Sequence, residues 1–348
     1  VDMGLFRVLA KAQSPLAASE IATQCNAELL WTQRLLRCLN AFGAVTQQWT
    51  TAEPLYTANN ISKAYVGEWP EATTRCLTEF WTPDWYKLPK VLRENGFKSL
   101  TSGTDTTFNK TWNAPGKHVW EILGDEAKEF LQPNGIFMTN FNSNHAQWFT
   151  FYPADERLVQ GAEKDAGAVF MVDVGGFTGS QLVVAREQFP TAPGRFILLD
   201  LPSALPKTPP AGLELRGHDF FKPYPEQIRG ARLYYMRTIG HDWAQADLVR
   251  ILTNIREAMQ PGYSKLIIND WIVPEENPYP FMCSQDLVMM SLGGGEERSE
   301  ARHREAIEAA GLKMTGIFHA GDRISEGVIE CEVPYCGCAC DNHAEVEA

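Results

Sequence analysis

The residues best suited to chemistry lie in a glycine-rich turn and in an acid that follows it. Gly175 and Gly176 come directly after an apolar run ending at Val174, and a helix-like segment begins near Gln181. Glycine lets the backbone turn sharply and approach a ligand closely, and the start of a helix favours a negative group. Asp200 ends the next apolar run, where a carboxylate can accept hydrogen bonds from both ribose hydroxyls. This pattern predicts a site for NAD or S-adenosylmethionine.

A second acidic segment favours S-adenosylmethionine. Asp219 can accept a hydrogen bond from an adenine amino group, and Phe220 can lie against the adenine ring. Together with the Val-Asp-Val-Gly-Gly sequence that ends at Gly176 and the Asp-Leu-Pro sequence that begins at Asp200, this segment closely resembles class I methyltransferases. We therefore expect S-adenosylmethionine as the cofactor.

Three further segments narrow the resemblance. They are the heptapeptide Arg-Thr-Ile-Gly-His-Asp-Trp that ends at Trp243, the run from Ala258 to Pro274, and the sequence Gly-Gly-Glu-Glu-Arg that ends at Arg298. With these segments the chain resembles the fungal branch of the plant and fungal caffeate-type O-methyltransferases. The resemblance covers nearly the whole chain, because the N-terminal helical segment is similar to the dimerisation domain of that family.

The resemblance implies roles for individual residues. His241 matches the family's catalytic base, a role that suits histidine because its pKa lies near neutrality. Glu297 and Asp270 match the two acids that flank the base. The implied cofactor contacts are Gly175, Gly176, Asp200, Asp219, Phe220 and Arg237. Met289, Met290 and Trp148 would wall the substrate, and His118 lies in an aromatic segment that we expect to face the same pocket.

The chain departs from the family pattern at three positions. Phe177 stands where the family has a third consecutive glycine, Asp270 is one methylene shorter than the usual Glu, and Gly240 replaces a bulkier apolar residue. A phenyl group in the glycine turn would crowd the amino-acid end of the cofactor.

Two functions therefore stay open. One is O-methyl transfer to a phenol or enol of a fungal-type secondary metabolite, with His241 as base. The other is a pericyclase or dehydratase activity that uses the same pocket on a polyketide-derived intermediate without methyl transfer.

Two acids close to His241 in the resemblance, Asp242 and Asp270, also have purely structural interpretations. Asp242 is followed three residues later by Gln245, which is a capping-box pattern, so we expect Asp242 to begin the next helix. Asp270 is equally well explained as a cap at the end of a strand.

Apolar runs that alternate with helix-like segments indicate a parallel sheet covered on both faces. We expect strands at residues 169–174, 195–200, 233–236, 265–268, 313–319 and 327–333. The predicted fold class is α/β, with a doubly wound Rossmann-like methyltransferase domain at residues 151–335. Residues 1–150 would form a mainly helical, winged-helix-like domain for dimerisation and for the substrate wall, and residues 336–348 a tail.

The N-terminal domain is expected to bind a second copy of the chain rather than nucleic acid. An apolar stripe over residues 29–39 predicts a helix that Gly43 ends. The segment around it carries Arg34 and Arg37 against Glu20 and Glu28, which is too little positive charge for a helix that reads phosphates.

Composition excludes several further classes of function. The 348 residues carry a formal net charge of -12, which disfavours a polyanionic partner. No apolar stretch is long enough for a membrane span, and the first residues do not resemble a signal peptide. The chain begins without Met inside a helical pattern, so we expect residues upstream. Scattered cysteines indicate reduced thiols and a cytoplasmic location, and we expect no metal at Cys336, Cys338 and Cys340.

Overall fold

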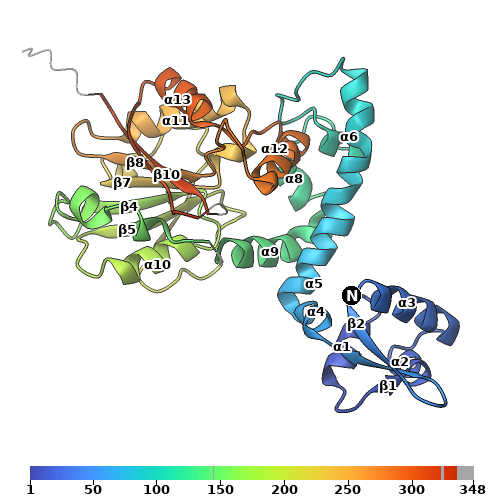
Figure 1. Ribbon diagram of the computed structural model, residues 1–348. Helices are drawn as coiled ribbons and strands as arrows, with labels where there is room; N and C mark the ends of the chain where they lie inside the picture. The colour runs from blue at the N-terminus through green and yellow to red at the C-terminus, as the bar shows by residue number, and fades with distance from the viewer. Residues whose placement is uncertain (144, 323–324, 335–348) are drawn as a thin grey trace, which may run out of the picture. The chain divides into compact units, whose positions relative to one another are not determined.

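The computed structural model describes residues 1–143, 145–322 and 325–334, so the cysteines of the tail lie outside the described residues. The chain forms two compact units (Figure 1). One contains Val1–Tyr86 with Ile122–Asn144, and the other contains Lys87–Glu121 with the chain from His145 onward. The expected limit at residue 150 falls near the last of these boundaries, whereas residues 87–121 cluster with the larger unit.

The larger unit is built on a seven-stranded mixed sheet with the order β6-β5-β4-β7-β8-β10-β9. Strands β4 to β8 are parallel, and β10 runs antiparallel to both β8 and β9. The strands are β4 (Val169–Val174), β5 (Arg195–Asp200), β6 (Glu214–Gly217), β7 (Leu233–Arg237), β8 (Lys265–Asp270), β9 (Lys313–Phe318) and β10 (Gly327–Glu332). The Rossmann-like fold expected from the apolar runs is confirmed, with β6 as an additional strand.

Helices cover both faces of this sheet. On one face, α11 (Gln245–Ala258) and α13 (Glu300–Ala309) bury Ile251, Ile255 and Ile307 against the strands. On the other face, α10 (Ser180–Gln188) buries Leu182 among apolar residues of the same strands. Two further helices of this unit, α7 (Thr107–Thr111) and α12 (Pro280–Gly293), contact each other. The parallel strands consequently present their carboxyl ends at one edge, where ligands bind in such folds.

The smaller unit is mainly helical. It begins with α1 (Leu5–Lys11), β1 (Leu16–Ala17), α2 (Ala18–Gln24), α3 (Leu29–Ala41), β2 (Val45–Trp49), β3 (Pro54–Ala58) and α4 (Asn60–Ala64). The strands pair in the order β1-β3-β2, and Leu9, Ile21 and Leu36 form the core. This is the winged-helix-like arrangement that the sequence predicted. Gly43 follows α3 with φ 72°, as expected for a residue that ends a helix.

Further helices complete the smaller unit. They are α5 (Glu68–Arg75), a π-helical turn (Cys76–Trp81) and α9 (Leu131–Ser143), while α6 (Thr82–Glu94) and α8 (Val119–Gly124) each cross a boundary between the units. Within the described residues, none of the helices has the length and apolar character needed to cross a bilayer.

Candidate active site

The glycine turn follows β4 and leads into α10. Gly175 has φ 74°, and a Cβ atom built on it would lie 2.6 Å from Cδ1 of Ile239. A Cβ atom on Gly176 would lie 2.3 Å from Oδ2 of Asp173. Both distances are too short for a real carbon atom, so the tight packing of this turn requires glycine at both positions.

Phe177 adopts the left-handed backbone conformation in which the family has glycine, with φ 52°. Such a conformation costs a residue with a side chain about 1–3 kcal/mol. The backbone N–H of Phe177 donates to Oδ2 of Asp200 at 2.8 Å, and the N–H of Leu201 donates to Oδ1 at 2.7 Å. Each oxygen of Asp200 retains a lone pair that can accept from a ribose hydroxyl. The phenyl side chain of Phe177 is 39% exposed.

Asp219 and Phe220 follow β6 at the same edge. Oδ1 of Asp219 accepts a hydrogen bond from the N–H of Phe221 at 3.0 Å. The ring of Phe220 packs edge-on against Trp243, with 5.6 Å between the ring centres. A Cβ atom on Gly175 would lie 3.8 Å from Cε1 of Phe220. The structure thus brings this aromatic residue beside the glycine turn, where the resemblance implies an adenosine moiety.

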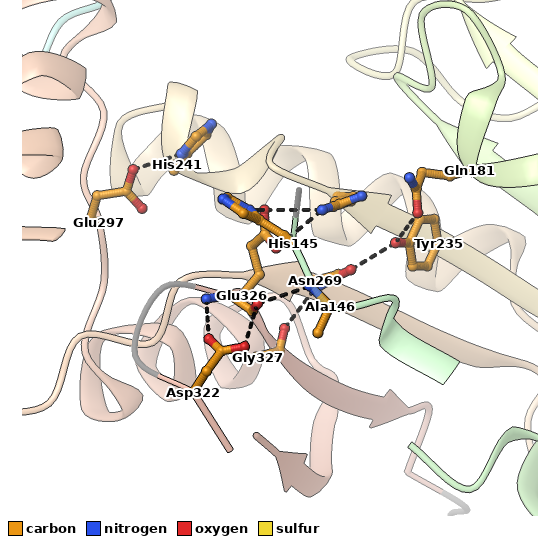
Figure 2. Close-up of polar contacts among 12 residues, drawn as sticks. His145, Ala146, Gln181, Tyr235, His241, Asn269, Glu297, Asp322, Glu326 and Gly327 are labelled. Carbon is orange, nitrogen blue, oxygen red and sulfur yellow. Dashed lines mark hydrogen bonds and ion pairs between the residues drawn. The ribbon is translucent and has the colours of Figure 1, made fainter. Parts of the chain in front are cut away.

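Arg237 ends β7 and lies in a buried cluster of charges. Its Nη2 lies 3.2 and 3.3 Å from the two carboxylate oxygens of Glu326, and Nδ1 of His145 lies 3.0 Å from Oε1 of the same Glu326. Figure 2 shows the contact between His145 and Glu326. Burial opposes ionisation of Glu326, but His145 and Arg237 outweigh it and lower the pKa of this carboxyl. Glu326 could not be recognised from the sequence, because only the fold places it beside β7.

Asp173 is a second residue that sequence analysis missed. It is buried within β4, and its Oδ2 has no hydrogen-bond partner among the residues whose positions are described. Burial, together with the charge of Asp200, raises the pKa of Asp173 to about 7. The signal was a charged residue inside an otherwise apolar run.

The side chains at this edge fit S-adenosylmethionine. Gly175 has no side chain that would block the approach of a ligand, and Asp200 and Asp219 offer hydrogen-bond acceptors. The Oδ2 atom of Asp173, which has no hydrogen-bond partner among the described residues, suits a positively charged donor such as an ammonium group. These residues would hold the ribose, the adenine and the amino-acid portion of that cofactor.

His241 lies in a 3-10 turn, Gly240–Asp242, shortly after β7. Its ring is buried, and Nδ1 lies 2.7 Å from Oε1 of Glu297 (Figure 2). Nε2 lies 3.5 Å from Oδ1 of Asp242. The expectation that Asp242 begins the next helix was wrong: α11 begins at Gln245, and its N-cap is Ala244 without a side-chain hydrogen bond. The 3-10 turn instead leaves the Asp242 carboxylate beside the imidazole.

The neighbouring acids determine the protonation of His241. Burial disfavours the charged ring, but the negative charges of Glu297 and Asp242, and the hydrogen bond that the ring donates to Glu297, raise the pKa of His241 to about 10. Burial in turn raises the pKa of Asp242 to about 6, although the charge of His241 opposes that shift.

Asp270 ends β8 but forms no hydrogen bond with His241. Its carboxyl is buried, and neither oxygen has a hydrogen-bond partner within the described part of the chain. A Cβ atom on Gly240 would lie 2.8 Å from Oδ2 of Asp270. Of the two acids that the resemblance implied, Glu297 contacts the imidazole and Asp270 lies against the backbone before it.

The loop that carries Glu297 is hydrogen-bonded to the turn that carries His241. Arg298 is 1% exposed and donates from Nη1 to the carbonyl of Gly240 at 2.7 Å and from Nη2 to the carbonyl of Trp243 at 2.7 Å. The N–H of Glu296 donates to the carbonyl of His241 at 3.0 Å. A Cβ atom on Gly295 would lie 2.0 Å from that carbonyl oxygen. Arg298 had no predicted role, because most of its hydrogen-bond acceptors are backbone carbonyls that no sequence motif marks.

Of the residues expected to wall the substrate, three are associated with the segment that carries His241 and one lies in the core of the sheet. The ring of His118 stacks on Trp243 with 4.1 Å between the ring centres, and burial lowers the pKa of His118 to about 4. Met289 and Met290 lie on α12, which contacts the turn that carries His241. Trp148 instead is buried in the sheet core beside Tyr235, with ring centres 5.3 Å apart.

A Rossmann-like mixed sheet with a glycine turn after its first strand binds nucleotide cofactors in several classes of protein. The acids after the next two strands, with Phe220 beside the glycine turn, favour the class I S-adenosylmethionine-dependent methyltransferases among them. Within that class, residues 102–313 match the model of the O-methyltransferase domain, and residues 1–68 match that of the O-methyltransferase dimerisation domain. The chain belongs to this O-methyltransferase family, whose cofactor is S-adenosylmethionine.

Individual relatives and solved structures are similar to this chain along most of its length. Methyltransferase cfoC of Aspergillus candidus is 32% identical over 320 residues, which cover 91% of this chain and 78% of the relative. The solved structure titled "A Pericyclic Reaction enzyme" matches with a TM-score of 0.84 at 26% identity, covering 96% of this chain and 84% of that chain. OxaC in complex with SAH and oxaline matches with a TM-score of 0.82 at 26% identity, covering 96% of this chain and 83% of that chain.

Replacing Glu297 with Gln tests the charge at His241. The variant loses the carboxylate that stabilises the imidazolium, so we expect the pKa of His241, measured by NMR titration of its ring, to fall from about 10 by roughly 2 units or more. The matched control is Glu300→Gln, a change of the same kind at an exposed position. An unchanged His241 titration in Glu297→Gln would contradict the assigned contact.

The same variant changes how stability depends on pH. His241 has a higher pKa in the folded chain than the ordinary value of 6.5, so its contribution to the free energy of unfolding is complete below about pH 6.5 and is lost as the pH rises through about 10. Denaturant unfolding between these limits is therefore expected to show a smaller pH dependence in Glu297→Gln than in the wild type.

Proposed function

We propose that this protein methylates a hydroxyl group, a phenol or an enol, of a fungal-type secondary metabolite, with His241 as general base. The observation that carries the proposal is the buried pair of His241 Nδ1 and Glu297 Oε1, 2.7 Å apart. His241 follows β7, so the pair lies at the edge of the sheet where the candidate cofactor residues gather, and Glu297 reaches it from the loop between α12 and α13.

The geometry of His241 suits removal of a proton. Glu297 engages Nδ1, so Nε2, which lies 3.5 Å from Oδ1 of Asp242, is the nitrogen that would accept the proton of the acceptor hydroxyl. The negative charge of Glu297 then stabilises the imidazolium that forms. Arg298 holds the turn through the carbonyls of Gly240 and Trp243, so that the ring keeps its direction. When bound, S-adenosylmethionine supplies the electrophilic methyl group.

The raised pKa of His241 has a kinetic consequence. In the free protein the ring carries two protons at neutral pH, so Nε2 must lose its proton before it can act as a base. Base catalysis by this residue is consequently expected to accelerate as the pH rises.

A second candidate function is a pericyclase or dehydratase activity without methyl transfer. The likeness to a solved pericyclic reaction enzyme favours it, and so does Phe177 in place of a glycine. In that case a protonated His241 would donate its Nε2 proton to a carbonyl or to a leaving hydroxyl, and its Nδ1–H would remain hydrogen-bonded to Glu297.

Cofactor binding is measured by isothermal titration calorimetry with S-adenosylmethionine. We expect the wild type to bind, because residue 177 contacts Asp200 through its backbone N–H and not through its side chain. The Phe177→Gly variant keeps this N–H. Asp200→Ala is expected to weaken binding at least about tenfold, or about 1.4 kcal/mol, whereas Phe177→Gly keeps it within a few-fold. Glu187→Ala, an exposed acid on α10, is the control. A wild type that does not bind S-adenosylmethionine, with binding restored in Phe177→Gly, would contradict the proposed methyl transfer.

The reaction itself is decided by product mass and by pH. With a panel of phenols and enolisable diketones, methyl transfer adds one methylene to the product, and its rate should rise up to about tenfold per pH unit above neutrality. The His241→Ala variant should lose turnover and keep cofactor binding. A product isomeric with the substrate, or lighter by one water, together with a rate that falls at high pH, would establish the second candidate function instead.

We also propose that the protein is a cytoplasmic homodimer that associates through its N-terminal unit. The match to the O-methyltransferase dimerisation domain supports this proposal, as do large apolar side chains exposed on that unit, such as Phe42 at 82%, Trp49 at 77% and Leu30 at 57%. The described cysteines are free thiols, which suits a reducing compartment.

A charge in this apolar surface should separate the subunits. Leu30→Asp is expected to shift the molar mass, measured by light scattering after size exclusion, from dimer to monomer. The control is Leu287→Asp, an exposed leucine on α12 of the larger unit, which should remain dimeric. A monomeric wild type would refute the proposed dimer.

A further inference from the structure

Gly240 precedes His241, and its backbone does not require glycine. Its φ lies outside the left-handed range, so a residue with a side chain could adopt the same conformation. The obstacle is another side chain: a Cβ atom on Gly240 would lie 2.8 Å from Oδ2 of Asp270, with its next neighbour, Cδ1 of Leu248, at 3.5 Å. The Asp270 carboxyl therefore fills the space in which a side chain of residue 240 would begin.

No polar contact fixes the Asp270 carboxyl in this place. The residue is 1% exposed, and neither of its oxygens accepts a hydrogen bond from any described residue. A buried carboxyl group is usually held by hydrogen bonds or by a counter-charge. Here the positive charges of His241 and Arg298 act on the carboxyl without a hydrogen bond, and the missing side chain of Gly240 leaves the space that it occupies.

The charge of Asp270 nevertheless reaches the imidazole. Burial has the largest effect on the pKa of His241 and lowers it. The charges of Glu297 and Asp242 raise this pKa, and the negative charge of Asp270 raises it by a smaller amount. Burial raises the pKa of Asp270 itself, and the positive charge of His241 counteracts that shift. Asp270 thus acts on His241 through space without a hydrogen bond.

We propose that Gly240 is a positioning residue: by leaving its side-chain position empty, it holds the Asp270 carboxyl against the backbone, and Glu297 remains the acid hydrogen-bonded to the imidazole Nδ1. The inference deepens the proposed function, because it rests on His241 as the proton-transferring residue. It also joins two departures from the family pattern, the glycine at 240 and the shorter acid at 270, into one matched change.

The test introduces Gly240→Ala into three backgrounds of the full-length protein and follows His241 by NMR titration without substrate. In the wild-type background the new methyl group displaces the charged carboxyl, and we expect the pKa of His241 to shift by about half a unit, since Coulomb energies at a few ångströms change by that order when a charge moves by roughly 1 Å. In the Asp270→Asn background the methyl group meets an uncharged amide of the same size, so the shift should vanish.

The third background is Asp270→Ala, where nothing obstructs the methyl group. Gly240→Ala should lower the melting temperature in the wild-type and Asp270→Asn backgrounds and leave it unchanged in Asp270→Ala. The control is Gly124→Ala, because a Cβ atom on Gly124 would meet nothing within 4 Å.

Two outcomes would overturn the proposal. One is a shift in the His241 titration that is equal in the wild-type and Asp270→Asn backgrounds, or absent from both. The other applies if Gly240→Ala alone does not fold: the Gly240→Ala/Asp270→Ala double variant must then fold and titrate like Asp270→Ala, and a double variant that fails to fold refutes the inference. Because the titration needs no turnover, these results are independent of whether methyl transfer is observed.

Discussion

The active-site end of the sheet depends on keeping a buried imidazole and its carboxylate together. A charge removed from water must be paired and hydrogen-bonded, or the fold loses several kcal/mol. Glu297 meets this requirement for His241. The buried guanidinium of Arg298 is satisfied in turn by the backbone carbonyls around the same turn, to which it donates hydrogen bonds. The loop between α12 and α13 must therefore lie on the turn after β7, which places both helices.

The sheet was predictable from the sequence, because each central strand is a continuous apolar run between segments of helical periodicity. Strand β6 was not among those runs: it is a short edge strand of partly exposed, mostly polar residues, and it forms by hydrogen bonding to β5 rather than by burial. The helix cap assigned to Asp242 failed for a similar reason. A local pattern allowed a cap, but tertiary contacts to Arg298 favoured a 3-10 turn.

The site was predictable where a residue type is tied to a backbone feature, as with the glycines after β4 and the acid that ends β5. It was not predictable where partners come from distant segments. Glu326 reaches Arg237 from the far side of β8, and the partnerless Oδ2 of Asp173 becomes apparent only when the described residues around it are in place. Phe177 belongs to neither group: its left-handed backbone is the glycine conformation retained without the glycine.

The packing of Gly295 limits how this protein can diversify. Any other residue there would collide with the carbonyl oxygen of His241, and a backbone atom cannot swing aside as a side chain can. Random libraries that include this position would consist mostly of inactive members. Half-buried Met290, on the helix that precedes the loop, is a side chain that the resemblance places beside the substrate, and a library aimed at acceptor preference would begin there instead.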